Sequence, residues 1–148
     1  MQTTRMSNGM PLSSRPSGIN DLYAIAERNA CQVDAFPISR PSLSIEHAGK
    51  CYIAMRPDVR GTLETEALAH EVGHCVFGGF YNRYSPFDRV QRAERRADKW
   101  AYYHLLPPSW LNECFRRMMS LCDIADEAGV SEEYASHAIE YYRMVGVL

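Results

Sequence analysis

Long apolar runs are missing from this 148-residue sequence, and no stretch approaches the roughly 20 residues that a membrane-spanning helix needs. The N-terminal segment MQTTRMSNGMPLSSRPSG lacks the apolar centre of a secretory signal, so we expect neither membrane insertion nor export. An excess of one charge is absent too, because 16 basic residues face 18 acidic ones. A net charge of −2 offers no general attraction to nucleic acid or to an anionic membrane.

The cysteines are few and irregularly placed. There are five, an odd number, and no two of them have the CxxC spacing of a thiolate zinc site. We therefore expect a protein of the reducing cytoplasm without a disulfide framework. Cys75 is expected to be a packing residue on an apolar helix.

The composition is that of an ordinary globular protein, with 46% hydrophobic and 23% charged residues and no internal repeats. A chain of this length most simply forms one domain with a sizeable core. Ser, Pro and Gly are frequent up to Gly18. We therefore expect residues 1–18 to be a flexible tail and residues 19–148 to be the domain.

Apolar periodicity and turn residues predict a mainly helical chain with one short hairpin. The β-prone segments 42–46 and 51–55 flank a turn at residues 47–50. Helices are predicted near residues 21–31, 64–77, 89–106, 109–118, 121–128 and 132–142. The last three helices, in residues 109–148, are expected to form a C-terminal helical subdomain.

The most informative segment is HEVGH, residues 70–74, inside the helix predicted at 64–77. Residues four apart lie on one face of a helix, so His70 and His74 can reach the same metal ion. Glu71 lies one step further round the helix, where it can accept a proton from a water molecule that the metal activates. The alternative is a buried helix that carries two hydrogen-bonded histidines.

A third metal ligand is offered by the helix predicted at 89–106. On a helical wheel Glu94 lies in the middle of the apolar stripe, with Asp98 beside it one turn further on. Glu94 therefore completes a zinc site of two histidines and one glutamate, and Asp98 can accept the remaining N–H of His70 or His74. The alternative for Glu94 is an ion pair with an arginine in the core.

Three segments together resemble the ImmA/IrrE family of small zinc metallopeptidases. They are HEVGH, then ERRADKWAYYHLLPP about twenty residues later, and then IADEAGVSEEYASHAIEYYRMVG. The resemblance extends roughly from Asp21 to Gly146 and is strongest from Leu68 to Pro107. It implies Zn²⁺ held by His70, His74 and Glu94, with Glu71 as the general base.

The resemblance also implies a fold and a function. The fold is α+β, a mainly helical zincin-like domain with a small antiparallel sheet packed on the HEVGH helix, followed by a C-terminal helical hairpin. The function is that of a zinc-dependent endopeptidase that cleaves a helix-turn-helix transcriptional repressor in phage, mobile-element or stress regulation. Segment 51–55 resembles the edge strand along which such peptidases bind an extended substrate.

Three questions stay open at this level. The donor that would stabilise the oxyanion is one of Tyr81, Tyr84, Tyr103 and His104. The same zinc residues would suit a zinc-stabilised protein that binds the repressor without cleaving it. Direct DNA binding by the C-terminal hairpin is disfavoured, because residues 109–148 carry three arginines against seven carboxylates.

Overall fold

The computed structural model describes residues 15–148, which form six helices and three strands. The helices are α1 (Ile19–Arg28), α2 (Thr62–Phe77), α3 (Phe87–Leu105), α4 (Pro108–Arg116), α5 (Leu121–Ala128) and α6 (Glu132–Met144). The strands are β1 (Gln32–Ala35), β2 (Ser42–His47) and β3 (Lys50–Met55). The predicted α+β class is confirmed.

The sheet is mixed, whereas a purely antiparallel sheet was expected. Strand β3 is central, with β2 antiparallel on one side and β1 parallel on the other. The sequence does not reveal β1, because its four residues, QVDA, are too short and too polar to show a periodicity. The expectation that segment 51–55 is the edge strand is wrong, since β3 is paired on both sides and β2 lies at the edge.

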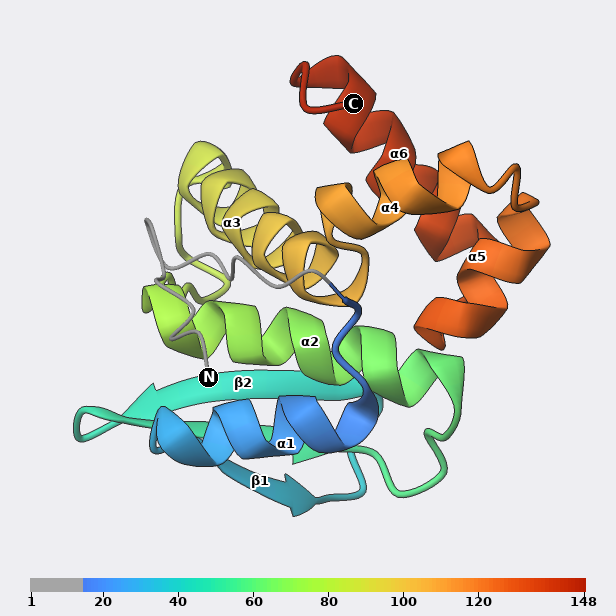
Figure 1. Ribbon diagram of the computed structural model, residues 1–148. Helices are drawn as coiled ribbons and strands as arrows, with labels where there is room; N and C mark the ends of the chain where they lie inside the picture. The colour runs from blue at the N-terminus through green and yellow to red at the C-terminus, as the bar shows by residue number, and fades with distance from the viewer. Residues whose placement is uncertain (1–14) are drawn as a thin grey trace.

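Helix α2 lies at the centre of the molecule, between the sheet on one side and α3 on the other (Figure 1). This position explains why the helix is apolar on nearly every side, with Leu68, Ala69 and Val72 all buried. The helix begins one residue after Gly61 and ends before Gly78, both of which have positive φ angles. Thr62 is thus the first helical residue, and Gly61 is the N-cap.

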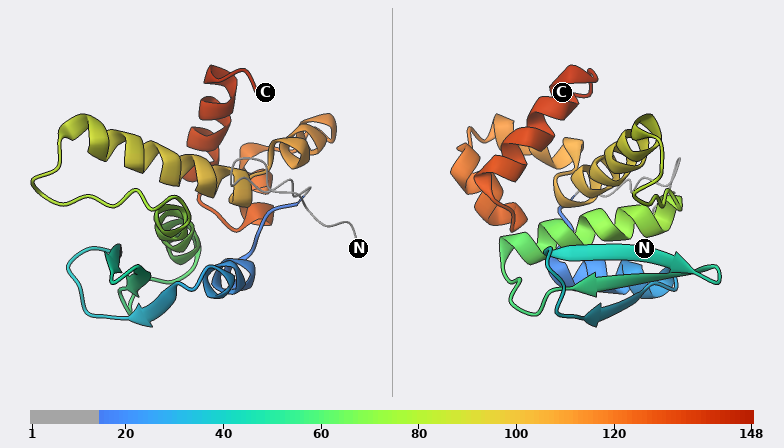
Figure 2. Two further views of the ribbon diagram at one scale, coloured as in Figure 1. Left: turned by 90° about the vertical axis from the view of Figure 1, so that its left-hand side faces the viewer. Right: turned by 180° about the vertical axis from the view of Figure 1, so that it is seen from behind.

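The three C-terminal helices gather at one end of α3, away from the sheet (Figures 1 and 2). Two hydrogen bonds attach them to the rest of the fold. The hydroxyl of Tyr142 donates to the carbonyl of Leu106 at 2.9 Å, and the backbone N–H of Ser131 donates to the carboxylate of Glu66 at 2.7 Å. One hydrophobic core includes residues from α1 through α6.

The described end of the expected N-terminal tail lies against α3. The backbone N–H of Ser17 donates to the carbonyl of His104 at 2.8 Å, and that of Gly18 donates to the carboxylate of Asp21. The remainder of the expected tail, residues 1–14, lies outside the described residues. Within residues 15–148, no helix has the length and apolar character needed to cross a bilayer.

A disulfide joins Cys51 of β3 to Cys75 of α2, with Cα atoms 5.7 Å apart. The odd number and irregular spacing of the cysteines gave no expectation of a disulfide, and the expectation that Cys75 only fills space in the core is wrong. Its partner lies 24 residues earlier in the chain, and nothing in that spacing indicates that the strand and the helix cross at these two positions. The free cysteines are Cys31, Cys114 and Cys122.

Candidate metal centre

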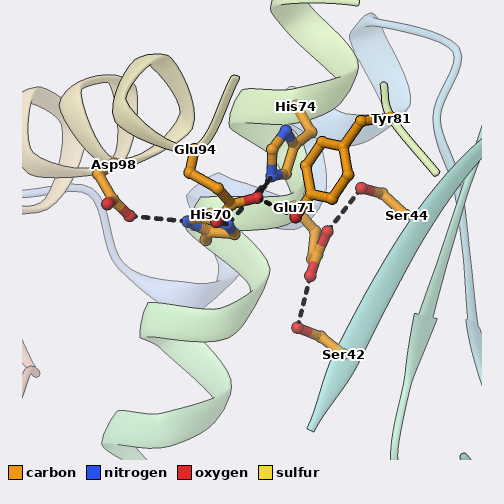
Figure 3. A network of polar contacts seen from close by, with 8 residues as sticks. All are labelled: Ser42, Ser44, His70, Glu71, His74, Tyr81, Glu94 and Asp98. Carbon is orange, nitrogen blue, oxygen red and sulfur yellow. Dashed lines mark hydrogen bonds and ion pairs between the residues drawn. The ribbon is translucent and has the colours of Figure 1, made fainter. Parts of the chain in front are cut away.

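Three side chains from α2 and α3 converge at one point (Figure 3). The Nε2 atom of His70 lies 3.0 Å from one carboxylate oxygen of Glu94, and the Nε2 atom of His74 lies 2.9 Å from the other. The two Nε2 atoms are 3.1 Å apart. His70 and His74 lie side by side because residues four apart are neighbours on a helix surface. The packing of α3 on α2 brings Glu94 to the two histidines.

These two imidazole nitrogens and the Glu94 carboxylate fit a tetrahedral metal ion. Bonds of about 2.0–2.1 Å at tetrahedral angles require donor atoms roughly 3.3 Å apart, which is close to the separations observed. Two imidazoles and a carboxylate are also the donor types that zinc accepts at sites with an open position. His70, His74 and Glu94 could thus hold zinc with little rearrangement.

Asp98 orients one of the two imidazoles. Its carboxylate lies 2.8 Å from Nδ1 of His70, so Nε2 of the same ring is directed at the point of convergence. Burial lowers the pKa of His70, but hydrogen bonds with Asp98 and Glu94 outweigh burial and raise that pKa to about 10. The two carboxylates therefore create an environment that favours a cation at this ring.

Tyr81 is the other partner of Glu94. Its hydroxyl donates to the Glu94 carboxylate at 2.6 Å. Burial tends to raise the pKa of Glu94, yet hydrogen bonds from His70, His74 and Tyr81 hold it well below its usual range. The pKa of Tyr81 rises to about 12 through burial and its bond to Glu94, so the phenol keeps its proton at neutral pH and remains a donor.

Glu71 points to the sheet side of the same cleft, where two serines hold it (Figure 3). The hydroxyl of Ser42 donates to one carboxylate oxygen at 2.8 Å, and that of Ser44 donates to the other at 2.5 Å. Residues two apart on a strand face the same way, which explains why both serines of β2 reach one carboxylate. Sequence reasoning missed this pair: it expected the sheet to pack on this helix, but no local pattern indicates which side chains of β2 meet Glu71.

The cleft has a volume of about 530 Å³ and runs between β2 and α2. His70, Glu71, His74 and Glu94 line it, together with residues 40–44 of β2 and the preceding loop. Tyr134 of α6 also lines the cleft, so the C-terminal helices contribute to its wall.

Of the four oxyanion candidates, the structure brings one into the cleft. Tyr81 lines it beside His74. Tyr84 is 78% exposed and contacts Arg83. Tyr103 packs against Tyr142 of the C-terminal helices.

The fourth candidate, His104, is excluded by burial. Its ring stacks on Trp100 at 3.7 Å between centroids, inside the core. Burial lowers the pKa of His104 to about 3, so the ring is neutral at any physiological pH. It neither faces the cleft nor carries charge into it.

A comparison with protein families decides what kind of protein carries this arrangement. Residues 32–140 match Peptidase_M78, the IrrE N-terminal-like domain. The chain belongs to the Peptidase_M78 family. The match runs from β1 into α6 and therefore includes every residue of the cleft described above.

Membership of Peptidase_M78 confirms the predicted resemblance and indicates a peptidase. The family is one of metallopeptidases, which agrees with a cleft in which His70, His74 and Glu94 converge. A search of curated proteins returned no match.

Proposed function

We propose that this Peptidase_M78 member is a zinc-dependent endopeptidase in which His70, His74 and Glu94 hold the metal. The observation that carries the proposal is the convergence of two imidazole nitrogens and one carboxylate, with contacts of 2.9–3.1 Å, in the lining of an open cleft. Zinc, when bound, supplies an activated water molecule and polarises the scissile carbonyl. A purely structural zinc site usually has four protein ligands and no use for an adjacent carboxylate such as Glu71.

Glu71 is proposed as the general base. Its carboxylate takes a proton from the attacking water and delivers it to the amine that leaves. Ser42 and Ser44 each donate to one of its oxygens, which fixes the orientation of the carboxylate toward the cleft. Each carboxylate oxygen has two acceptor sites, so one hydroxyl on each leaves room for the transferred proton.

Strand β2 is proposed to bind the substrate. It is paired only with β3 among the described strands, and the residues that begin it line the cleft. An extended peptide can add to such an edge as a further strand, which places its backbone across the cleft. Tyr81 is proposed to donate to the oxygen of the scissile carbonyl as negative charge develops there.

The proposed substrate is a cytoplasmic helix-turn-helix repressor. This step rests on the family resemblance of the sequence and on the presence of a peptide-sized cleft. The second candidate is a zinc-stabilised protein that removes the repressor from DNA by binding alone. The donation of two hydroxyls to Glu71 favours the enzyme, because a scaffold has no need of an oriented carboxylate there.

The test is cleavage of a co-expressed partner repressor, scored by gel, with wild type and Glu71→Gln compared directly. Glutamine keeps the shape and removes the base, so the rate should fall by at least about 10²-fold. Glu113→Gln is the matched control, because Glu113 is an exposed residue of α4 whose carboxylate pairs with Arg116 and does not line the cleft. Release of an intact repressor by both wild type and Glu71→Gln would instead establish the binding protein.

A further inference from the structure

Three sulfur atoms cluster where α2 packs against β3 and the end of α1. The Sγ atoms of Cys31, Cys51 and Cys75 all lie within 4.8 Å of one another. Two of them already form the disulfide between β3 and α2, and Cys31 is a free thiol. Because two of the three sulfurs are bonded to each other, this arrangement favours sulfur exchange over a metal site with three thiolate ligands.

Cys31 is held in place by its backbone. It follows Ala30, whose φ angle of 55° turns the chain at the end of α1. The backbone N–H of Cys31 donates to the carbonyl of Ala26 at 2.9 Å. The thiol of Cys31 donates to the carbonyl of Asn29 at 3.7 Å, and its Sγ atom lies within 4.8 Å of the sulfurs of Cys51 and Cys75.

We propose that Cys31, Cys51 and Cys75 form a thiol–disulfide exchange site, with Cys31 as the internal nucleophile and a small thiol of the glutathione class as the external partner. This site is separate from the metal cleft, and the proposal does not depend on the peptidase activity.

The chemistry balances without an oxidant in its first step. The Cys31 thiolate attacks one sulfur of the Cys51–Cys75 bond, a new bond to Cys31 forms, and the displaced cysteine leaves as a thiolate that takes up the proton. Two molecules of the external thiol then reduce the new bond and are themselves joined as a disulfide. Burial raises the pKa of the Cys31 thiol, so a small fraction of it is thiolate at neutral pH and the internal step is slow.

A route for the external partner is present at the surface. Cys31 lines an open depression of about 440 Å³, together with Tyr23, Glu27 and Lys50. Cys31 is 8% exposed where it lines this depression, and Cys51 and Cys75 are partly buried beside it. A thiol as small as glutathione can approach the three cysteines through this depression.

The Cys51–Cys75 disulfide links α2, the helix that carries His70 and His74, to the sheet. Cys75 directly follows His74, and Cys51 lies on β3, the central strand. A disulfide that closes a loop of this size stabilises a fold mainly by restricting the unfolded chain. Opening it should lower the melting temperature by about 5–12 °C.

Single variants test whether Cys31 reaches both partners. The full-length chain is equilibrated with excess oxidised glutathione, quenched with acid, alkylated and mapped by mass spectrometry. Cys75→Ser should yield a Cys31–Cys51 disulfide, and Cys51→Ser should yield a Cys31–Cys75 disulfide. Cys122→Ser, a change at an exposed free cysteine, should retain the native Cys51–Cys75 bond.

The rate of opening tests the role of Cys31 as nucleophile. In reduced glutathione, Cys31→Ser should open the Cys51–Cys75 bond at least about 10-fold more slowly than wild type or Cys122→Ser, since an internal thiol has a high effective concentration. Circular dichroism establishes that each variant is folded. Equal opening rates in folded Cys31→Ser and wild type would overturn the proposal, as would the absence of Cys31-linked disulfides in both single variants.

Discussion

Gly73 of α2 faces the backbone of Ala97 of α3 so closely that a Cβ atom at residue 73 would lie 2.9 Å from the Ala97 carbonyl oxygen. The glycine of HEVGH therefore lets the two helices approach each other. Ala97 lies one turn beyond Glu94, so this contact also sets how near the Glu94 carboxylate comes to the imidazoles of α2.

Gly73→Ala should weaken both the fold and the metal site. Alanine suits a helix better than glycine by about 1 kcal/mol, but the clash is with backbone atoms that cannot rotate away, and overpacking costs about 1–3 kcal/mol. We expect a lower melting temperature and zinc affinity reduced at least about 10-fold, measured by calorimetry. Gly18→Ala is the control, because its added Cβ meets only an ordinary contact at 3.8 Å. Unchanged zinc affinity in Gly73→Ala would show that helix spacing does not limit the site.

Removal of the histidines should remove the metal. Purified wild type should contain about one zinc per chain, and His70→Ala or His74→Ala should lose it and melt at a lower temperature, because the energy of metal binding is also folding energy. Mass spectrometry of the metal and thermal melting measure the two effects. His137→Ala, at an exposed position on α6, should change neither. Full metal content in a variant lacking both His70 and His74 would disprove the assignment.

Asp98→Asn should retain zinc but bind it about 10–100-fold more weakly. The amide keeps the size of the carboxylate yet is a poorer acceptor for Nδ1 of His70, which lies 2.8 Å from it. Asp88→Asn on the same helix is the control, since Asp88 is exposed and pairs with the exposed Arg92. A chelator competition assay gives the affinities. If Asp98→Asn loses zinc as completely as Glu94→Ala, Asp98 is itself a ligand.

Tyr81→Phe should reduce kcat by about 10²-fold with little effect on KM, because an oxyanion donor acts mainly in the transition state. Zinc content should be retained, since the three metal ligands stay in place. Tyr84→Phe removes the hydroxyl of the exposed neighbour and should leave kcat unchanged. A rise in KM without a fall in kcat would show that Tyr81 binds substrate and has no special role in the transition state.

Local spacing is the part of this site that sequence reasoning reaches well. His70 and His74 face one way because a helix turns once in 3.6 residues, and the same periodicity distinguishes Glu94 and Asp98 from the arginines around them. The structure brings these four side chains together. Helix boundaries were predictable for the same reason, and those of α5 agree residue for residue.

The order of the strands in the sheet depends on long-range pairing and not on local periodicity. β1 is a four-residue strand that pairs in parallel with β3, a contact made across some twenty residues of sequence. If β1 is not recognised, segment 51–55 looks like the edge strand of the sheet. The sequence therefore predicts substrate binding along β3 and not along β2.

The sequence by itself determined the family, the two helices that bring His70, His74 and Glu94 together, and the helical character of the C-terminal residues, because each depends on a short periodic pattern. Only the tertiary structure decided that Ser42 and Ser44 hold Glu71, that Tyr81 alone of four candidates lines the cleft, and that Cys51 meets Cys75 beside Cys31. These contacts join segments far apart in the chain. Their geometry arises from the packing of the sheet against α2, which no local pattern encodes.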